Sequence, residues 1–193
     1  MEKLAATDLM SLEQYARERP VFRARVLRHK SERQLAVGPH ATWCFEDRLT
    51  VQYQVQEMLR AERIFEADGI AAELEAYNPL IPDGHNWKVT LLLEYQAPER
   101  PAALARLKGV EDRCWVQVAG HVRVYAIADE DMERENAEKT SAVHFLRFEL
   151  GAAMIAGLKG GAALAAGIDH EHYRYAVDPF PAARLRALLA DLA

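Results

Sequence analysis

Apolar side chains recur at helical spacing near the start of the chain and predict a helical lead-in over about residues 1–33. We expect a first helix that ends before Pro20, because proline has no backbone N–H to donate to a helical hydrogen bond. A second helix is expected directly after it, where apolar residues from Val21 to Leu27 form a stripe among arginines. The clearest helical pattern of the chain follows at residues 50–65, which we call the central predicted helix.

Alternating or continuous apolar runs elsewhere predict strands, separated by turn residues such as Gly38-Pro39 and the segment 81–84. The expected strands are two short runs within 34–46, then 87–95, two within 114–128, 141–150 and 173–177. Further helices are expected near 69–77, at 98–108, over the Ala- and Gly-rich stretch 152–166, and after Pro181. Hairpins and helices of uneven length argue against a regular array of parallel β-α-β units. The pattern therefore predicts an α+β fold, with a mostly antiparallel sheet on which helices pack.

Length and composition indicate one globular domain spanning residues 1–193. Half of the 193 residues are hydrophobic and 27% are charged, the ordinary balance of a globular protein. The N-terminus lacks the uninterrupted apolar core of a secretory signal, and no window approaches the roughly 18 consecutive apolar residues of a membrane span. We therefore expect a cytoplasmic protein that does not associate with membranes.

The charge balance disfavours nucleic acid as a partner. Asp and Glu outnumber Lys and Arg by 29 to 24, a formal net charge of −5, whereas phosphate binding needs a concentrated positive surface. The nearest approach to such a surface is the arginine-rich segment from Arg17 to Arg33. We interpret this segment as a solvated helix face, and nucleic-acid binding through the second helix as the less favoured alternative.

Sequence motifs exclude several cofactors. The chain has no Walker loop, no dinucleotide fingerprint, and neither the zinc-protease nor the serine-hydrolase motif. Cys44 and Cys114 are too few to hold an iron–sulfur cluster, and no flavin or haem motif is present. A divalent metal is the cofactor that remains to be considered.

One carboxylate, that of Glu62, falls on the apolar face of the central predicted helix. This face is defined by Val51, Val55, Met58 and Phe65 at helical spacing. A buried carboxylate has a raised pKa unless a cation or a metal lies beside it. We expect Glu62 to reach the rim of the core or to pair with an arginine such as Arg147, and a catalytic role is the alternative.

His144 falls on the apolar face of the strand predicted at 141–150, on the same side as Leu146 and Phe148. A buried, hydrogen-bonded histidine is the favoured interpretation. The alternative is a metal site in which His144 and Glu62 converge with Glu57 or Glu94. The catalytic candidates are Glu62, His144, Glu57 and Arg147, the metal candidates are His144, Glu62 and Glu94, and more distant candidates are His121, the acidic run 129–131, His170 and His172. We expect His170 and His172 to lie in an exposed loop.

Several long segments of the chain resemble one bacterial family, DUF3501, a domain of unknown function. The matching segments are 45–50 (FEDRLT), 53–60 (YQVQEMLR), 77–82 (YNPLIP), 128–131 (ADED) and 141–148 (SAVHFLRF). Members of the family are often encoded beside rubrerythrin-like di-iron proteins and cysteine-rich iron–sulfur oxidoreductases. The resemblance implies a role in redox or peroxide stress and a partner from one of these two classes, but it implies no catalytic residues.

These observations leave three functional hypotheses and do not decide whether the protein is an enzyme. The first is an accessory or binding protein linked to redox stress, which engages a protein through a polar face containing Glu46, Asp47, Glu57, Arg60 and Arg63. The second is a metal-binding protein or metal-dependent enzyme with a His/Glu pocket. The third is nucleic-acid binding through the arginine-rich helix. A homodimer is the default oligomer for a chain of this size.

Overall fold

The computed structural model describes residues 2–128 and 139–193. The strands are β1 (Gln34–Ala36), β2 (Ala41–Glu46), β3 (Asn86–Leu93), β4 (Cys114–Val118), β5 (Val124–Tyr125), β6 (Ile127–Ala128), β7 (Val143–Glu149), β8 (Leu164–His170) and β9 (Tyr173–Val177). The α-helices are α1 (Leu12–Ser31), α2 (Arg48–Glu62), α3 (Ala67–Tyr77), α4 (Arg100–Arg106), α5 (Ala152–Lys159) and α6 (Ala182–Leu189). Short 3₁₀ helices are η1 (Ala6–Asp8), η2 (Asn78–Leu80) and η3 (Glu111–Arg113).

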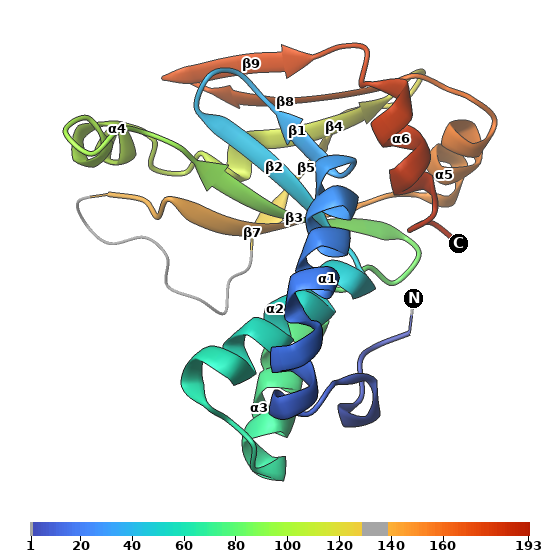
Figure 1. Ribbon diagram of the computed structural model, residues 1–193. Coiled ribbons are helices and arrows are strands. Elements are labelled where there is room, and N and C mark those ends of the chain that lie inside the picture. Colours follow the sequence, from blue (N-terminus) through green and yellow to red (C-terminus); the bar gives the residue numbers. More distant parts are fainter. Residues whose placement is uncertain (1, 129–138) are drawn as a thin grey trace.

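The strands form two antiparallel sheets, which confirms the predicted α+β class. The first sheet has the order β1-β2-β3-β7-β6 and the second has the order β5-β4-β8-β9. Helices α1, α2 and α3 project away from the sheets, and we call them the helical arm (Figure 1). No helix among the described residues is long and apolar enough to cross a membrane.

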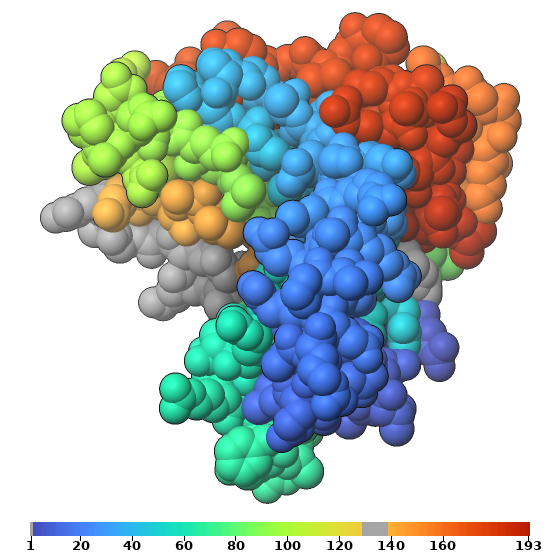
Figure 2. All heavy atoms as spheres, viewed as in Figure 1, coloured from blue at the N-terminus to red at the C-terminus, as the bar shows by residue number. Residues whose placement is uncertain are grey.

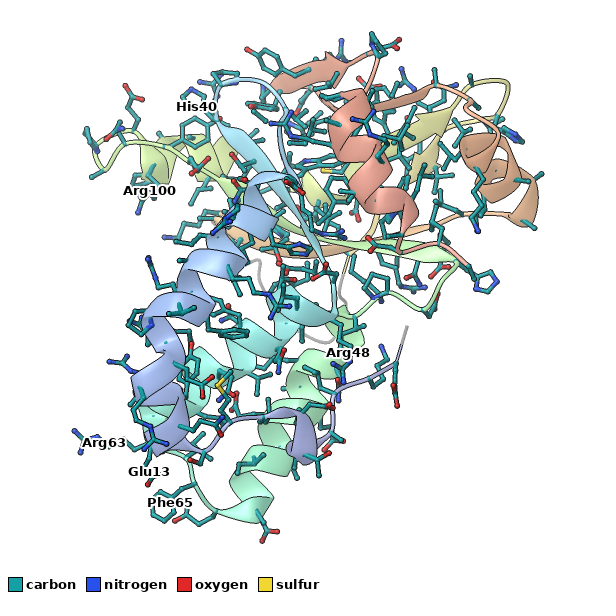
Figure 3. The ribbon with its side chains drawn as sticks, turned by 45° about the vertical axis from the view of Figure 1, so that its right-hand side comes forward. Glu13, His40, Arg48, Arg63, Phe65 and Arg100 are labelled. Atoms are coloured by element: carbon teal, nitrogen blue, oxygen red, sulfur yellow. The ribbon has the colours of Figure 1, made fainter. Side chains whose placement is uncertain are left out.

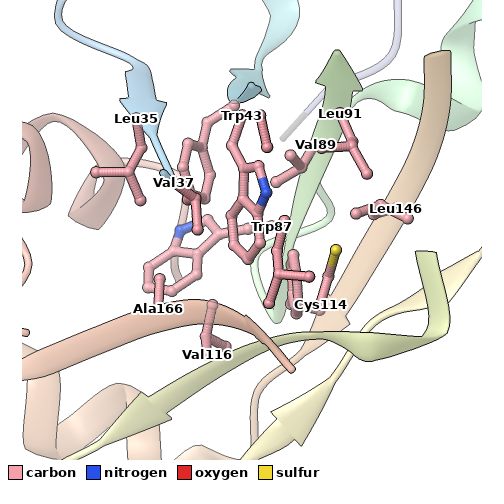
Figure 4. Packing of buried hydrophobic residues seen from close by; sticks show 14 of the residues in the cluster. Leu35, Val37, Trp43, Trp87, Val89, Leu91, Cys114, Val116, Leu146 and Ala166 are labelled. Atoms are coloured by element: carbon pink, nitrogen blue, oxygen red, sulfur yellow. The ribbon is translucent and has the colours of Figure 1, made fainter. Parts of the chain in front are cut away.

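The main core lies between the inner faces of the two sheets. Aromatic side chains of the first sheet fill much of it: the Trp43 ring stacks on Phe148 with centroids 5.3 Å apart, and Phe45 meets Trp87 edge to face. Val116 and Ala166 approach from the second sheet (Figure 4). Alternation along the first sheet therefore gives it an inner face in this core and an outer face turned toward the helical arm.

One continuous helix, α1, replaces the two helices predicted around Pro20. Pro20 lies inside α1, so the expected break before it is wrong. Ala16 and Pro20 are both exposed, and water can bond to the carbonyl that proline leaves without a donor. Tyr15 and Phe22 are buried on either side of Pro20, and their packing on α2 keeps the helix continuous.

The single helix predicted over residues 152–166 is also wrong. Helix α5 ends at Lys159, and Leu164–His170 form strand β8, which pairs with β4 and β9. Gly167 shows why glycine is needed in this strand: a Cβ there would lie 2.6 Å from the Trp115 ring. The small residues of this stretch therefore serve close packing in a sheet as well as in a helix.

Arg33 links the first sheet, the helical arm and the end of the chain. Its guanidinium is buried, with 3% of the side chain exposed, and it forms ion pairs with Asp191 and with Asp47. It also donates hydrogen bonds to the backbone carbonyls of Phe45, Glu46 and Ala187. We call Arg33, Asp47 and Asp191 the charged junction. It connects the end of β2 and the start of α2 with α6.

The two carboxylates of the charged junction have different environments. Burial raises the pKa of Asp191 to about 6, although the charge of Arg33 opposes this shift. Burial acts on Asp47 in the same direction, but Arg33, the Thr50 N–H and His29 outweigh it, so the pKa of Asp47 is lowered. Asp47 also caps α2, since its Oδ1 accepts from the Thr50 N–H at 2.9 Å. Asp47 is therefore the more firmly held anion of the two.

Replacing Arg33 by alanine should lower the free energy of unfolding by about 3–5 kcal/mol, because two carboxylates would remain buried without their cation. Urea denaturation followed by circular dichroism measures the change. Arg28→Ala is the matched control: Arg28 lies on the last turns of α1, is exposed, and should change stability by less than about 0.5 kcal/mol. Equal losses in the two variants would contradict the role assigned to Arg33.

Candidate functional site

His144 lies in the main core, as the strand alternation predicts. The residue is 3% exposed, and its Nε2 lies 3.0 Å from both the Thr140 hydroxyl and the Ser141 carbonyl. A carbonyl can only accept, so Nε2 carries a hydrogen. Nε2 is also 3.8 Å from a carboxylate oxygen of Glu111. The favoured interpretation, a hydrogen-bonded buried histidine, fits this geometry.

Glu62 is exposed, so it is not buried on the apolar face of α2, and the expected pairing with Arg147 does not occur. Helix α2 ends at Glu62 because Arg63 adopts a left-handed conformation with φ of 57°. Glu62 is exposed, and Phe65 is 70% exposed at the tip of the arm (Figure 3). The apolar stripe of α2 is instead Val51, Val55 and Leu59. Because α2 ends at Glu62, the predicted stripe does not continue to Phe65, which lies beyond the helix.

The remaining candidates occupy three further places. Arg147 lies on the outer face of the first sheet and pairs with Glu149, not with Glu62. Glu94 follows β3 and is exposed, with its Oε2 accepting from the Thr42 hydroxyl at 2.6 Å. Glu57 lies between α1 and α2. The structure thus does not bring His144, Glu62 and Glu94 together, and no group of three or more potential metal ligands occurs in residues 2–128 and 139–193.

The polar face proposed for a protein partner is not one surface. Glu46 and Asp47 are buried, with 9% and 8% exposed, while Arg60 and Arg63 are exposed on the arm. Glu57 is held by Arg19, whose guanidinium donates two hydrogen bonds of 2.7 Å, and by the Tyr15 hydroxyl at 2.5 Å. Glu46, Asp47 and Glu57 therefore hold the fold together at separate points, and the five residues do not form a common interface.

His170 and His172, both expected in an exposed loop, lie in two different environments. His170 belongs to the strand and is 7% exposed, with Nε2 donating to the Lys108 carbonyl at 3.0 Å. His172 lies in the following turn and is exposed. His121 lies in the turn after β4, and the acidic run 129–131 falls outside the described residues. An exposed loop for both histidines is therefore correct for His172 only.

A cavity of about 280 Å³ lies between the outer face of the first sheet and the helical arm. Its apolar wall consists of Val51, Leu80, Leu92, Val143 and Phe145. Its polar lining consists of Lys30, Cys44, Glu46, Gln54, Tyr77 and Thr90. The lining comes from all three arm helices, from η2 and from three strands of the first sheet. An apolar wall with a few convergent polar groups is the usual composition of a small-molecule site.

Glu46 is the most deeply placed charged group of the cavity. Strand alternation puts it beside Cys44 on the outer face of β2, while Trp43 and Phe45 point into the main core. Glu46 Oε1 accepts a hydrogen bond of 2.6 Å from the Thr90 hydroxyl. Within the described part of the chain, this is the one hydrogen bond of the Glu46 carboxylate. Its second oxygen is therefore available to a ligand in the cavity.

Lys30 and Cys44 complete the polar side of the cavity. The Lys30 ammonium lies 5.9 Å from the centre of the Tyr53 ring and forms no ion pair with a described residue. Burial, and then the neighbouring charge of Glu46, raise the pKa of Cys44. The thiol is therefore a poor nucleophile near neutral pH. Binding, not covalent chemistry, is what this arrangement of groups favours.

A second hollow of about 550 Å³ lies beside the β8–β9 turn and has a different character. Charged side chains of both signs line it: Lys108, Asp112, Arg113, Asp169, Glu171 and Arg174. Arg174 and Asp169 already pair at 3.3 Å. The charges of this second hollow offset one another, and the described residues that line it form no apolar wall. The cavity between the first sheet and the helical arm is therefore the better candidate for a ligand site.

Sequence reasoning missed this cavity although it singled out Glu46. The available signal was the outer face of β2, where Thr42, Cys44 and Glu46 alternate with buried aromatic residues. A glutamate so placed is expected to point to solvent. Only the packing of the helical arm over this face, which depends on contacts distant in the sequence, makes it a cavity.

The comparisons with known proteins agree on the fold and assign no activity. A family model described as "Protein of unknown function (DUF3501)" matches residues 3–192. A solved structure, described as that of a novel protein of unknown function from Burkholderia pseudomallei K96243, is 52% identical over 100% of both chains, with a TM-score of 0.91. No curated protein matches. The resemblance drawn from the sequence segments is therefore confirmed over nearly the whole chain.

The contacts of Glu57 with Tyr15 and Arg19 should make the stability of the α1–α2 packing depend on pH. The hydrogen bonds from Arg19, with that from Tyr15, lower the pKa of Glu57 to about 2 against the desolvation that would raise it. A carboxyl with a lowered pKa in the folded state stabilises the fold above its ordinary pKa of 4.5, and this contribution is lost as the pH falls toward 2.

We therefore expect Glu57→Gln to destabilise the protein at pH 6 and to approach the parent chain in stability as the pH is lowered from about 4.5. Urea midpoints measured from pH 6 downward test this. Glu62→Gln, on the same helix but exposed, should show no such convergence. A constant difference between Glu57→Gln and the parent chain across this range would contradict the assignment.

Proposed function

The chain belongs to the DUF3501 family, and we propose that it is a binding protein for a small molecule, held in the cavity between the first sheet and the helical arm. The single observation that carries this proposal is the Glu46 carboxylate, which is 9% exposed and has one hydrogen bond from the described residues. A buried carboxylate is costly unless its oxygens are bonded. A ligand that donates to the second oxygen would add a charge-assisted hydrogen bond to Glu46.

The lining indicates the chemical class of the ligand. Glu46 accepts hydrogen bonds and favours a cationic or donating group, such as an amine. Leu92, Val143 and Phe145 favour an apolar body on the other side. Drug-sized ligands occupy pockets of roughly 300–1,000 Å³, so a cavity of about 280 Å³ suits a smaller compound. We therefore propose a small amphiphilic amine as the ligand class.

The family resemblance supports placing this binding role in redox or peroxide stress. Burial raises the pKa of both Cys44 and Cys114, which disfavours direct reaction of either thiol with an oxidant. We propose that the protein acts in such a pathway through what it binds, as an accessory to a rubrerythrin-like or iron–sulfur partner.

Benzylamine is a suitable probe, because it joins an ammonium group to an apolar ring of the right size. We expect it to shift the backbone amide signals of Cys44, Thr90 and Leu92 in a nuclear magnetic resonance titration. Benzoate, which has the same shape and the opposite charge, should not. Glu46→Gln should weaken benzylamine binding by about tenfold or more, since it removes a charge-assisted hydrogen bond.

Glu94→Gln is the matched control. Glu94, like Glu46, accepts a hydrogen bond of 2.6 Å from a threonine on the outer face of the sheet, but Glu94 is exposed and lies outside the cavity lining. It should bind benzylamine as the parent chain does. The absence of cavity shifts with benzylamine at millimolar concentration would overturn the proposal, as would equal weakening by both variants.

A further inference from the structure

The outer face of α1 exposes an apolar stripe that no other part of the described chain covers. The stripe consists of Pro20, Val21, Ala24 and Leu27, which share one side of the helix by their spacing. Val21 is 78% exposed and Leu27 is 45% exposed. Figure 2 shows α1, in blue, uncovered at the front of the molecule. Only Tyr15, Phe22 and Val26 are buried on the opposite side of this 20-residue helix.

Four exposed arginines surround the apolar stripe. Arg17 and Arg28 lie at its two ends, and Arg23 and Arg25 lie on its two flanks, because successive residues of a helix are separated by about 100°. None of the four forms an ion pair with a described residue. In contrast, Arg19 forms an ion pair with Glu57. Arg33 forms ion pairs with Asp47 and Asp191. The free arginines are therefore those that point away from the fold.

The charge of α1 is opposite to that of the remaining chain. Residues 12–31 contain six basic and two acidic side chains, a net charge of +4, whereas the whole chain carries −5. Residues outside α1 therefore carry −9. Such separation creates a local positive potential on an acidic protein and steers acidic partners to one place.

We propose that this face of α1 docks an acidic amphipathic helix of a partner protein. The stripe is an apolar centre with a charged rim, the arrangement of a protein–protein interface, and arginine is among the residues enriched there. The stretch from Arg17 to Arg28 covers about 16 Å along the helix axis, or three turns, which matches one packed partner helix. Apolar residues of the partner would lie on Val21 and Leu27, and its carboxylates would pair with the arginines.

Other occupants fit the observations less well. Packing α1 against α1 of a second copy would bring two sets of arginines together, which is repulsive. A membrane surface favours basic helices with larger apolar side chains, such as Trp and Phe, than the Val and Leu present here. A nucleic acid would use the arginines but leave the apolar stripe unused. The combination of an aliphatic centre with an arginine rim selects an acidic protein segment.

The test uses a synthetic helical peptide with leucines on one face and glutamates on both flanks, and a second peptide with lysines in place of the glutamates. Fluorescence anisotropy with the full chain measures both affinities. We expect the glutamate peptide to bind and the lysine peptide not to bind. Val21→Asp should weaken binding at least tenfold, and Arg17→Glu with Arg28→Glu should abolish it.

Val122→Asp is the matched control, because Val122 is 77% exposed and lies outside α1. It should bind the glutamate peptide as tightly as the parent chain. All of these substitutions are at exposed positions, so unchanged circular dichroism and melting temperature should confirm folding. Equal binding of the two peptides, or equal losses from Val21→Asp and Val122→Asp, would overturn the proposal. Tighter binding of a DNA duplex or of anionic phospholipid vesicles through the same arginines would overturn it as well.

Discussion

The buried guanidinium of Arg33 holds the first sheet, the helical arm and the α6 region in one arrangement. A positive charge with 3% exposure must be balanced inside the protein, and Arg33 obtains this balance from Asp47 and Asp191 and from three backbone carbonyls. These partners come from the end of β2, the start of α2 and the region of α6. Because Asp47 also caps α2, the direction in which the arm leaves the sheet depends on the same carboxylate.

The cavity depends on this constraint through Glu46, the residue next to Asp47. The charged junction fixes the backbone at Glu46, whose carbonyl accepts from Arg33, while its side chain turns to the outer face and bonds to Thr90. Strand β2 therefore serves two environments: Trp43 and Phe45 fill the core between the sheets, and Cys44 and Glu46 face the arm. The proposed ligand site lies between the helical arm and the first sheet, and the proposed docking face lies on the outer surface of the same arm.

The sequence predicted the fold class and most strands, because strand alternation is a local property; His144 was correctly assigned to the apolar face of β7. The predictions were wrong where contacts between residues distant in the sequence determine the local structure. Pro20 predicted the end of a helix, but α1 continues past it because Tyr15 and Phe22, on either side, are buried. The left-handed Arg63 ends α2 before Phe65, and Glu62 is exposed at the last position of the helix. Pairing with β4 and β9 makes part of an Ala- and Gly-rich stretch into β8. The cavity could not be predicted, because Glu46 becomes enclosed only when the arm packs over the sheet.

The sequence separation within the charged junction has a consequence for synthesis on the ribosome. Arg33 and Asp191 are 158 positions apart, so Arg33 is made long before its second carboxylate exists. At roughly 5–20 residues per second, the delay between the two is roughly 8–30 s. During this interval the nascent chain can form α1 and the β1–β2 hairpin, but it cannot close the region around Arg33. Closure of this region therefore waits until the residues around Asp191 have been made, so it is a late step in the folding of the described chain.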